Sequence, residues 1–391
     1  MSSPRAWAIL GAVTAGTLQC EGGSPDPEDR ARAVAELDRL RAAVAEALAG
    51  FLAEKQQTLA AMSPDLIPVV DELTAVTAGG KRLRPAFAYW GWRGFRDSAG
   101  GPAPEDEAAV LCAAAALEFF HGSALVHDDV MDAATTRRGR PATHIGFSGR
   151  HVTGGLDGNS SAFGVGAAIL VGDLALVWSD EMLHRSGLSA AALTRARSVW
   201  DTMRTEVTAG QYLDLLRAAG GLPGPQGALT VARYKSAGYT VQRPLQLGAA
   251  IAGAGPEVLA ACTDIGLPLG EAFQLRDDVL GVFGDPAVTG KSADDDLREG
   301  KQTLLIALTE EATDAAGREL LAAHLGNPAA GPEEFEALRE LIEASGARAS
   351  VEQRITERTA QARSAIAAAP LAADARAALD VLAVAATERT A

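Results

Sequence analysis

The chain has 391 residues, of which 48% are hydrophobic, and its formal net charge is −15. This hydrophobic fraction can build a large core, whereas the negative charge argues against nucleic acid or an anionic membrane surface as a partner. The cysteines, Cys20, Cys112 and Cys262, are scattered and odd in number. They are typical of reduced thiols, so we expect a cytoplasmic protein.

Residues 1–26 are predicted to be a disordered or loosely packed tail, with an export or anchoring segment as the less favoured alternative. The apolar stretch from Ala6 to Leu18 is too short to span a bilayer, and the loop-like QCEGGSPDPEDR follows it. We therefore expect no stable membrane insertion. From residue 27 to residue 391, helical periodicity continues without a linker-like break, and alternating strand patterns are scarce. This part is predicted to be one all-helical domain.

Basic residues first gather in GGKRLRP, Gly79 to Pro85, beside a flexible Gly-Gly turn. The stretch contributes Lys81, Arg82 and Arg84. Arginine binds phosphate oxygens with two parallel hydrogen bonds, and lysine binds them as a point charge. The stretch is therefore a candidate phosphate-binding segment.

The stretch from Glu107 to Asp132 is predicted to be a long buried helix, because it has no proline, one glycine and a continuous apolar spine. It ends in the acidic motif HDDVMD. Asp128 and Asp132 are four residues apart, so they lie on one helical face about a turn from each other, with Asp129 beside them. Such hard oxygen ligands suit Mg²⁺, and no Cys/His pattern for zinc competes.

Further basic residues follow this helix. TTRRGRPATH supplies Arg137, Arg138 and Arg140, and RYKSAGYT supplies Lys235. Between these motifs, the glycines and serines of HVTGGLDGNSSAFG, His151 to Gly164, predict a mobile loop near the mouth of a site.

A second acidic motif, RDDVLGVFGD, ends another apolar helical pattern, from Gly270 to Phe283. It contains Asp277 and Asp278, and Gly281 stands where a third acid could have stood. Lys291 and Lys301 follow, on either side of the run from Asp294 to Asp296. We expect this run to be a solvated loop that helps to close the site when Mg²⁺ and diphosphate bind.

The two acidic motifs together indicate a metal site. A lone Asp-Asp pair is usually a solvated turn or helix end, but acids inside apolar helices need positive charge to compensate them. We therefore predict that the motifs form two walls of one cavity, where Mg²⁺ and converging Arg and Lys side chains bind a polyphosphate. For Arg82, Arg140 and Arg298, an ordinary surface charge remains an equal alternative.

Several stretches, in this order along the chain, carry a resemblance to a known family: GGKRLRP, LEFFHGSALVHDDVMD, TRRGRPATH, ILVGDLAL, YKSAGYTVQRPLQLG, and FQLRDDVLGVFGDPAVTGK with DDLREGK. Together they resemble trans-isoprenyl diphosphate synthases of the polyprenyl synthetase family, most of all actinobacterial geranylgeranyl diphosphate synthases. The resemblance implies an all-α fold, a single large helical bundle of the isoprenoid synthase type around a central apolar cavity. It also implies a homodimer.

The resemblance also implies the reaction and the residues that carry it. Isopentenyl diphosphate would condense with an allylic diphosphate (dimethylallyl, geranyl or farnesyl), with three Mg²⁺ ions per active site. The implied metal ligands are Asp128, Asp129, Asp132 and Asp277, with Asp278 in a supporting role. The implied allylic diphosphate contacts are Arg137, Lys235, Ser236, Gln274, Lys291 and Lys301. The implied isopentenyl diphosphate contacts are Lys81, Arg84, His121 and Arg138. The implied catalytic residues are Asp128, Asp129, Arg137, Lys235 and Asp277.

The chemistry explains these residue types. Ionisation of an allylic diphosphate leaves a carbocation and a pyrophosphate group that gathers negative charge, which Mg²⁺, Arg and Lys stabilise. The carbocation needs an apolar cavity without water, and isopentenyl diphosphate must be held beside it. No protein nucleophile is required, and none is evident.

Product length is expected to depend on the helix ahead of Asp128. The side chains one and two turns back, Ser123 with Ala124 and Phe119 with Phe120, are predicted to line a product tunnel. In similar relatives that make twenty-carbon chains, an aromatic residue often stands where this chain has Ser123. We favour geranylgeranyl diphosphate as the product, with twenty-five carbons or more as the main alternative.

Two other function classes fit the sequence less well. A terpene cyclase normally adds an Asn-Asp…Ser…Glu metal motif, but the two asparagines of this chain, Asn159 and Asn327, lie in no such setting. A silent subunit of a heteromeric synthase tends to lose an acidic motif or the basic set, and here both are intact.

Overall fold

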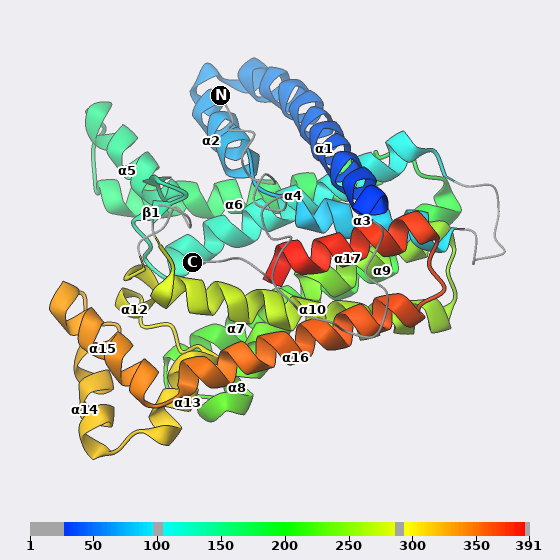
Figure 1. The fold of residues 1–391 in the computed structure, drawn as a ribbon. Coiled ribbons are helices and arrows are strands. Elements are labelled where there is room, and N and C mark those ends of the chain that lie inside the picture. The colour runs from blue at the N-terminus through cyan, green and yellow to red at the C-terminus, as the bar shows by residue number, and fades with distance from the viewer. Residues whose placement is uncertain (1–26, 97–104, 286–292, 388–391) are drawn as a thin grey trace.

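The protein is described by a computed structural model that covers residues 27–96, 105–285 and 293–387. The described part is all-α, as predicted, and its two strands have two residues each (Figure 1). The elements are α1 (Pro27–Met62), η3 (Pro64–Leu66), α2 (Ile67–Thr77), α3 (Leu83–Phe95), α4 (Glu107–Met131), β1 (Thr136–Arg137), β2 (Arg140–Pro141), α5 (Thr143–Thr153), α6 (Ser160–His184), α7 (Ala190–Ala218), α8 (Gly224–Val231), η4 (Ala232–Gln242), α9 (Arg243–Ala252), α10 (Pro256–Phe283), α12 (Asp295–Arg298), α13 (Leu304–Ala312), α14 (Ala315–His324), α15 (Pro332–Ala344), α16 (Ala347–Ala368) and α17 (Ala373–Thr387).

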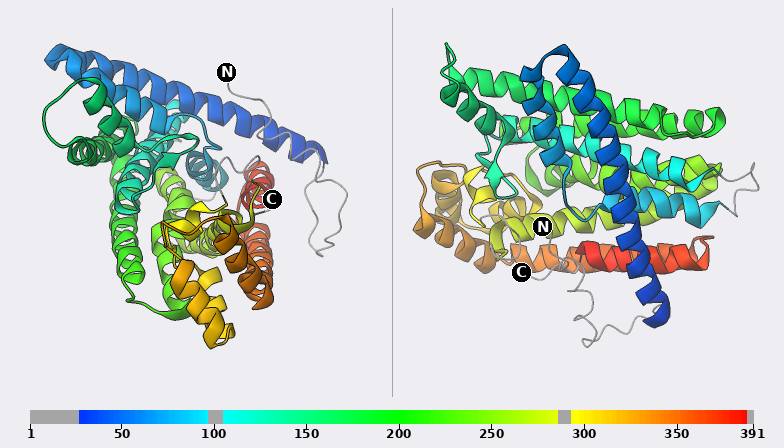
Figure 2. Two further views of the ribbon diagram at one scale, coloured as in Figure 1. Left: turned by 90° about the vertical axis from the view of Figure 1, so that its left-hand side faces the viewer. Right: turned by 90° about the horizontal axis from the view of Figure 1, so that it is seen from above.

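Helix α4 lies at the centre of the bundle and confirms the helix expected over Glu107 to Asp132. Asp106 caps its first turn by accepting a hydrogen bond from the Ala108 amide. Four consecutive alanines, 113–116, are almost fully buried, and their small side chains let neighbouring helices pack closely. Helices α1, α3 and α6 pack against α4, and α1 crosses over the bundle (Figure 2).

The segment that carries Lys235 is a π-helix, η4, between α8 and α9. Irregular helices of this kind often occur at functional sites. Gly210 of α7 makes the position of η4 possible, because a Cβ on residue 210 would lie 2.3 Å from the backbone nitrogen of Lys235. Helix α7 therefore approaches the backbone of η4 directly and fixes the base of the Lys235 side chain.

Helix α10 is longer than the pattern from Gly270 to Phe283 predicted, and it joins two hydrophobic clusters. The first half of α10 packs in the large core around α3, α4 and α9. Its second half packs with α13, α15 and the start of α16. The acidic motif near the end of α10 is thus held by the second cluster.

The structure corrects one expectation, and another falls on residues that it does not describe. The loop predicted from His151 to Gly164 is wrong at both ends, because α5 reaches Thr153 and α6 begins at Ser160, where Asn159 caps the helix. The expected tail over residues 1–26 lies outside the described residues, so the domain boundary stays a prediction. Among described cysteines, Cys112 and Cys262 are free thiols.

Candidate active site

A cavity of about 530 Å³ opens beside the C-terminal halves of α4 and α10. Both acidic motifs line it, as the sequence predicted. The predicted site residues that line it are Lys81, Arg84, His121, Ala124, Asp128, Arg137, Arg138, Lys235, Ser236, Gln274, Asp277, Asp278 and Lys301. They come from six segments, so the fold gathers into one cavity residues that are far apart in the sequence.

Asp128 is the centre of a polar network on the α4 side. Lys235 Nζ lies 2.7 Å from Asp128 Oδ1 and 2.6 Å from Asp214 Oδ2. Gln211 donates to the same Asp128 oxygen at 3.1 Å. Burial acts to raise the pKa of Asp128, but Lys235 outweighs it and the pKa is lowered. Burial opposes the charge of Lys235, yet Asp128 and Asp214 raise its pKa, so Lys235 is a cation.

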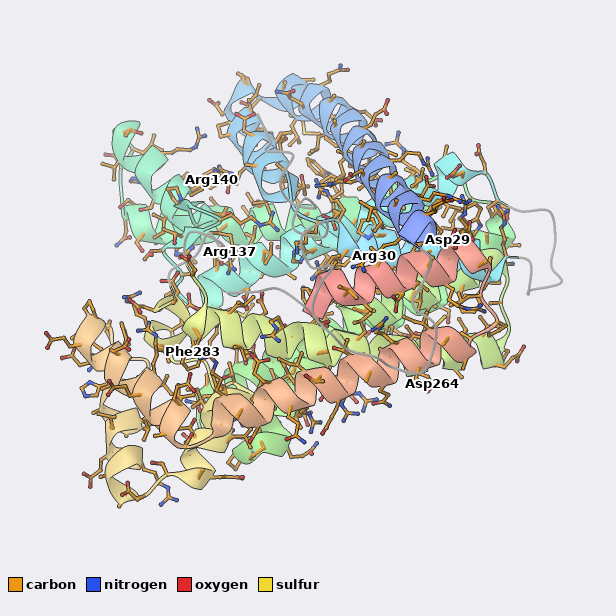
Figure 3. All side chains as sticks on the ribbon, viewed as in Figure 1. Asp29, Arg30, Arg137, Arg140, Asp264 and Phe283 are labelled. Carbon is orange, nitrogen blue, oxygen red and sulfur yellow. The ribbon has the colours of Figure 1, made fainter. Side chains whose placement is uncertain are left out.

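Asp129 faces a different partner from Asp128. Its side chain is almost fully buried, and Arg137 Nε donates to Asp129 Oδ1 at 2.7 Å. Arg137 therefore reaches the cavity from the β1–β2 ribbon, beside the end of α4 (Figure 3), with its guanidinium held by Asp129. Asp132 lies one turn beyond Asp128, and burial together with the Asp128 charge raises its pKa to about 7.

The α10 wall holds the second group of acids. Gln274 donates to Asp278 at 2.7 Å. Burial raises the pKa of Asp278 to about 7, and the charges of Asp296 and Asp277 add to this shift. Asp296 also lines the cavity and accepts a hydrogen bond from Lys301 at 2.7 Å. The expectation of a solvated loop over Asp294 to Asp296 is thus wrong for Asp296, since α12 carries this side chain into the site and leaves it 17% exposed.

The donor set fits Mg²⁺. Within the described segments, no three Asp, Glu, His or Cys side chains converge closely enough to hold an ion by themselves. Mg²⁺ normally keeps waters and takes one or two carboxylates plus substrate phosphates, so this open arrangement suits it. Burial and neighbouring carboxylates raise the pKa values of Asp132 and Asp278, and a bound cation would offset both effects.

A second corner of the cavity is basic. Arg84 Nη2 donates to Thr240 Oγ1 at 3.0 Å, and its guanidinium lies 4.4 Å from the centre of the Tyr239 ring. Arg84 Nε is buried and has no hydrogen-bond partner in the described structure. Arg138 also lines this corner and donates to the Ala78 carbonyl at 3.2 Å. The corner therefore presents two guanidinium groups to an anionic ligand, and one of their donors, Arg84 Nε, is buried.

His121 sits within this basic corner as a neutral side chain. Its Nδ1 lies 3.2 Å from the Tyr239 hydroxyl. Burial, with the neighbouring charges of Arg84 and Arg138, holds the pKa of His121 well below its ordinary value. An uncharged imidazole can therefore form a hydrogen bond here without adding charge.

Arg82, Arg140 and Arg298, for which a surface charge was an equal alternative, each pair with an acidic residue. Arg82 is buried and pairs with Glu118, so its role is structural even though it borders the cavity. Arg140 is exposed and lies 3.4 Å from Glu72. Arg298 pairs with Asp295 at 3.1 Å and packs over the Phe335 ring. Lys291 lies outside the described residues.

The four residues predicted to line a product tunnel differ in position. Ala124 lines the cavity. Phe119 is fully buried on another face of α4, where it packs against Phe51 and Trp178. Phe120 packs edge-on against Tyr239, which does line the cavity. Ser123 is buried but is not part of the cavity wall.

Sequence reasoning missed several polar residues of the site. Asp214 and Gln211 are three residues apart on α7, a spacing that puts both on one helical face and was readable in GQYLD. Tyr239 and Thr240 stand in the same motif as Lys235. Asp296 had no detectable signal, because a run of three acids is usually solvated.

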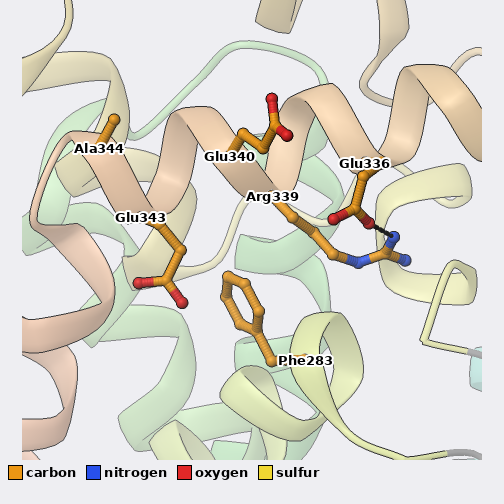
Figure 4. Close-up of a pocket in the computed structure, with 6 residues that line it drawn as sticks. All are labelled: Phe283, Glu336, Arg339, Glu340, Glu343 and Ala344. Atoms are coloured by element: carbon orange, nitrogen blue, oxygen red, sulfur yellow. Dashed lines mark hydrogen bonds and ion pairs between the residues drawn. The ribbon is translucent and has the colours of Figure 1, made fainter.

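A second hollow, of about 570 Å³, lies away from this site. The end of α10 and one face of α15 line it, with Phe283, Arg339 and the carboxylates of Glu336, Glu340 and Glu343 (Figure 4). No candidate site residue lines it, so the cavity lined by the two acidic motifs remains the candidate functional site.

Comparisons with known proteins agree with this geometry. The family model described as polyprenyl synthetase matches residues 69–342, well over half of the chain. The chain belongs to the polyprenyl synthetase family. It is therefore a prenyltransferase, and its all-α bundle is the isoprenoid synthase fold.

Members of the polyprenyl synthetase family resemble this chain over most of its length. A geranylfarnesyl diphosphate synthase from Aeropyrum pernix is 34% identical over 70% of this chain and 79% of its own. A geranylgeranyl diphosphate synthase from Mycobacterium tuberculosis is 33% identical, with 77% of each chain covered. The solved structure of a geranylgeranyl pyrophosphate synthase from Corynebacterium glutamicum, complexed with isoprenyl diphosphate and magnesium, has a TM-score of 0.86. It is 41% identical and covers 90% of this chain and 99% of its own.

Proposed function

We propose that this prenyltransferase condenses isopentenyl diphosphate with an allylic diphosphate and makes all-trans geranylgeranyl diphosphate. The observation that carries the proposal is one cavity with two different walls. One wall has acids from α4 and α10 with Lys235 between them, and the other has Arg84, Arg138 and a neutral His121. Such walls suit two diphosphates, one bound through Mg²⁺ and the other bound by Arg and Lys side chains without a metal ion.

The acidic wall is proposed to bind the allylic diphosphate. Asp128, Asp132 and Asp277 would hold Mg²⁺, which when bound neutralises the charge that gathers on the leaving pyrophosphate. Three ions would be bound at each site, as the family resemblance implies. Arg137, Lys235, Ser236, Gln274, Lys291 and Lys301 are proposed to contact the diphosphate oxygens. Asp129 would act through Arg137, because its carboxylate is already paired with that guanidinium.

The basic corner is proposed to bind isopentenyl diphosphate. Lys81, Arg84 and Arg138 would bind its diphosphate, and the unpartnered Arg84 Nε supports this role. His121 would add a hydrogen bond. Holding this substrate beside the allylic carbon would make the bond-forming step a positioned one, and apolar side chains that line the cavity, among them Leu125, Val231 and Phe273, would keep water from the carbocation.

A pyrophosphate-release assay tests the proposal against its alternatives. With Mg²⁺, release that requires both isopentenyl and farnesyl diphosphate is the expected result. Release from the allylic substrate alone would identify a cyclase, and no release with either or both would identify a silent subunit. Chromatography of dephosphorylated products then separates the twenty-carbon chain from longer ones.

The assembly is proposed to be a cytoplasmic homodimer that forms through α6. Two described helices, α4 and α6, are long and apolar enough to cross a membrane, but 78% of the apolar window of α4 is buried in the bundle, against 28% for α6. Leu170 and Val177 of α6 are 67% and 60% exposed. An exposed apolar face needs a partner, and the net charge of −15 disfavours an anionic membrane. A second copy of this chain is the occupant that we propose.

A further inference from the structure

Position 281 on α10 has no room for a side chain. Gly281 stands four residues after Asp277, so the two share one face of the helix. A Cβ on Gly281 would lie 1.8 Å from Oδ2 of Asp296 and 2.6 Å from its Cγ. The Asp296 carboxylate therefore occupies the space that a third acid of the second motif would fill.

Asp296 is fixed in this position from both sides. Its Oδ1 accepts a hydrogen bond from Lys301 Nζ at 2.7 Å, and its carbonyl accepts one from the Lys301 amide at 3.0 Å. The next residue, Leu297, is 1% exposed, and its carbonyl accepts a hydrogen bond from the Gly326 amide at 2.8 Å. Because α12 is anchored in the core, Asp296 cannot move away without breaking these hydrogen bonds and disturbing the packing of Leu297.

The three acids of the run have separate partners. Asp294 pairs with Arg339 of α15, whose Nε also donates to the Val282 carbonyl at 2.9 Å. Asp295 pairs with Arg298 at 3.1 Å. Within the run, Asp296 is the member that lines the active-site cavity. Arg339 thus joins the end of α10 to the start of α12, and this link supports the alignment of Asp296 over Gly281.

We propose that Asp296 supplies, from α12, the carboxylate that Gly281 leaves out of the second acidic motif. Asp277, Asp278 and Asp296 would then face the allylic diphosphate and its Mg²⁺ together. The inference rests on the proposed function. It assigns to α12 and to its anchor on α15 a part in metal binding, because oxygen ligands and the groups that orient bound water both set Mg²⁺ affinity.

The first test measures thermal unfolding of the full chain with Mg²⁺ and inorganic pyrophosphate. In Asp296→Asn, the Mg²⁺ concentration for half-maximal stabilisation should rise by about tenfold or more. Asp295→Asn is the matched control, since its carboxylate lies one residue away and pairs outside the cavity, and it should respond like wild type. A wild-type response from Asp296→Asn would overturn the inference.

The second test exchanges the two positions. Gly281→Asp alone should lower stability and weaken the Mg²⁺ response, because its side chain collides with Asp296. Asp296→Gly alone should weaken the thermal stabilisation by Mg²⁺ and pyrophosphate, but it should not cause the loss of stability expected from the collision. The double variant, with Gly281→Asp and Asp296→Gly, should recover most of the Mg²⁺ response. A double variant no better than Asp296→Gly would contradict the proposed substitution.

Failure of this inference can be told from failure of the proposed function. Asp277→Asn serves as the reference, because Asp277 belongs to the metal site in either case. If wild type shows no stabilisation by Mg²⁺ with pyrophosphate, both proposals fail. If wild type responds, Asp277→Asn does not, and Asp296→Asn matches wild type, the role of Asp296 alone is wrong.

Discussion

Asp128 and Asp129 are neighbours in the chain, yet they have different partners. Asp128 points into the cavity and binds Lys235, whereas Asp129 is buried against Arg137. The family resemblance implied that both are metal ligands, and the sequence by itself shows only their spacing. It cannot show which of two adjacent carboxylates an arginine from a later ribbon will bind. The structure supports a direct role for Asp128 and a positioning role for Asp129.

The buried acids predict a pH-dependent stability of the metal-free protein. The folded pKa of Asp278 is about 7, above its ordinary value, so the native state binds more protons than the unfolded state between about pH 4 and 7. Stability therefore falls as the pH rises through this window. At pH 8, Asp278→Asn should raise the melting temperature of metal-free protein by about 2 °C or more, and the difference should shrink toward pH 5.

The control for this prediction is Asp295→Asn, which should show no such difference. Mg²⁺ with pyrophosphate should stabilise wild type more than Asp278→Asn. Equal melting temperatures of metal-free wild type and Asp278→Asn at pH 8 would mean that the charge of Asp278 is already compensated.

The two walls predict a separation of kinetic effects. Arg84→Lys should raise KM for isopentenyl diphosphate by about tenfold, because lysine lacks the second parallel hydrogen bond, with little effect on the allylic substrate. Lys235→Met should lower kcat by about a hundredfold through weaker stabilisation of the leaving group. Arg140→Lys is the control, because Arg140 is exposed and pairs with Glu72. Equal effects of Arg84→Lys and Lys235→Met on both substrates would refute the assignment of the two walls to different substrates.

At the scale of elements, helices were more predictable than their irregularities. The apolar spine and missing proline indicated α4 almost to the residue. The π-helix η4 could not be predicted, because it depends on how closely α7 approaches at Gly210. Nor could α12, whose acidic sequence looks solvated but whose Leu297 is buried in the second cluster.

Helix α4 also carries the prediction on product length. We predict that Phe120→Ala lengthens the product, because Phe120 supports the Tyr239 ring at the cavity wall. Ser123 is buried behind this wall, and we predict that Ser123→Phe shortens the product because the larger ring would press the wall into the cavity. Each step should be about one isoprene unit, since one helical turn is about 5.4 Å. Phe119→Leu is the matched control, because its ring packs toward Phe51 and Trp178. Chromatography of dephosphorylated products decides, and unchanged products from Ser123→Phe and Phe120→Ala would show that α4 does not set the length.

At the scale of the whole molecule, the family motifs indicated the fold class and a prenyl-transfer activity, and the comparisons confirmed both. The meeting of the two acidic motifs in one cavity also followed from the sequence, because buried acids need a shared compensating charge. The exposed apolar surface of α6 could not be predicted from the sequence. A continuous apolar helix has the same sequence pattern whether a neighbour within the chain or a second copy covers it.

The proposed dimer gives a prediction for α6. Leu170→Lys combined with Val177→Lys should convert a dimer to a monomer, because two charges would enter an apolar interface. Light scattering after gel filtration measures the mass. Met62→Lys is the control, because Met62 is 69% exposed at the end of α1. A monomeric wild type, or a double variant that stays dimeric, would contradict the placement of the interface.

The cavity is proposed to hold two diphosphate sites, one that requires Mg²⁺ for binding and one that does not. Calorimetric titration of isopentenyl diphosphate and of an unreactive thiolodiphosphate analogue of farnesyl diphosphate, each with and without Mg²⁺, tests it most directly. We predict that the farnesyl analogue binds only with Mg²⁺ and is lost in Asp128→Asn. Isopentenyl diphosphate should bind without Mg²⁺, survive Asp128→Asn and weaken in Arg84→Lys. An equal need for Mg²⁺ in both ligands, or an equal loss of both in Asp128→Asn, would contradict the account.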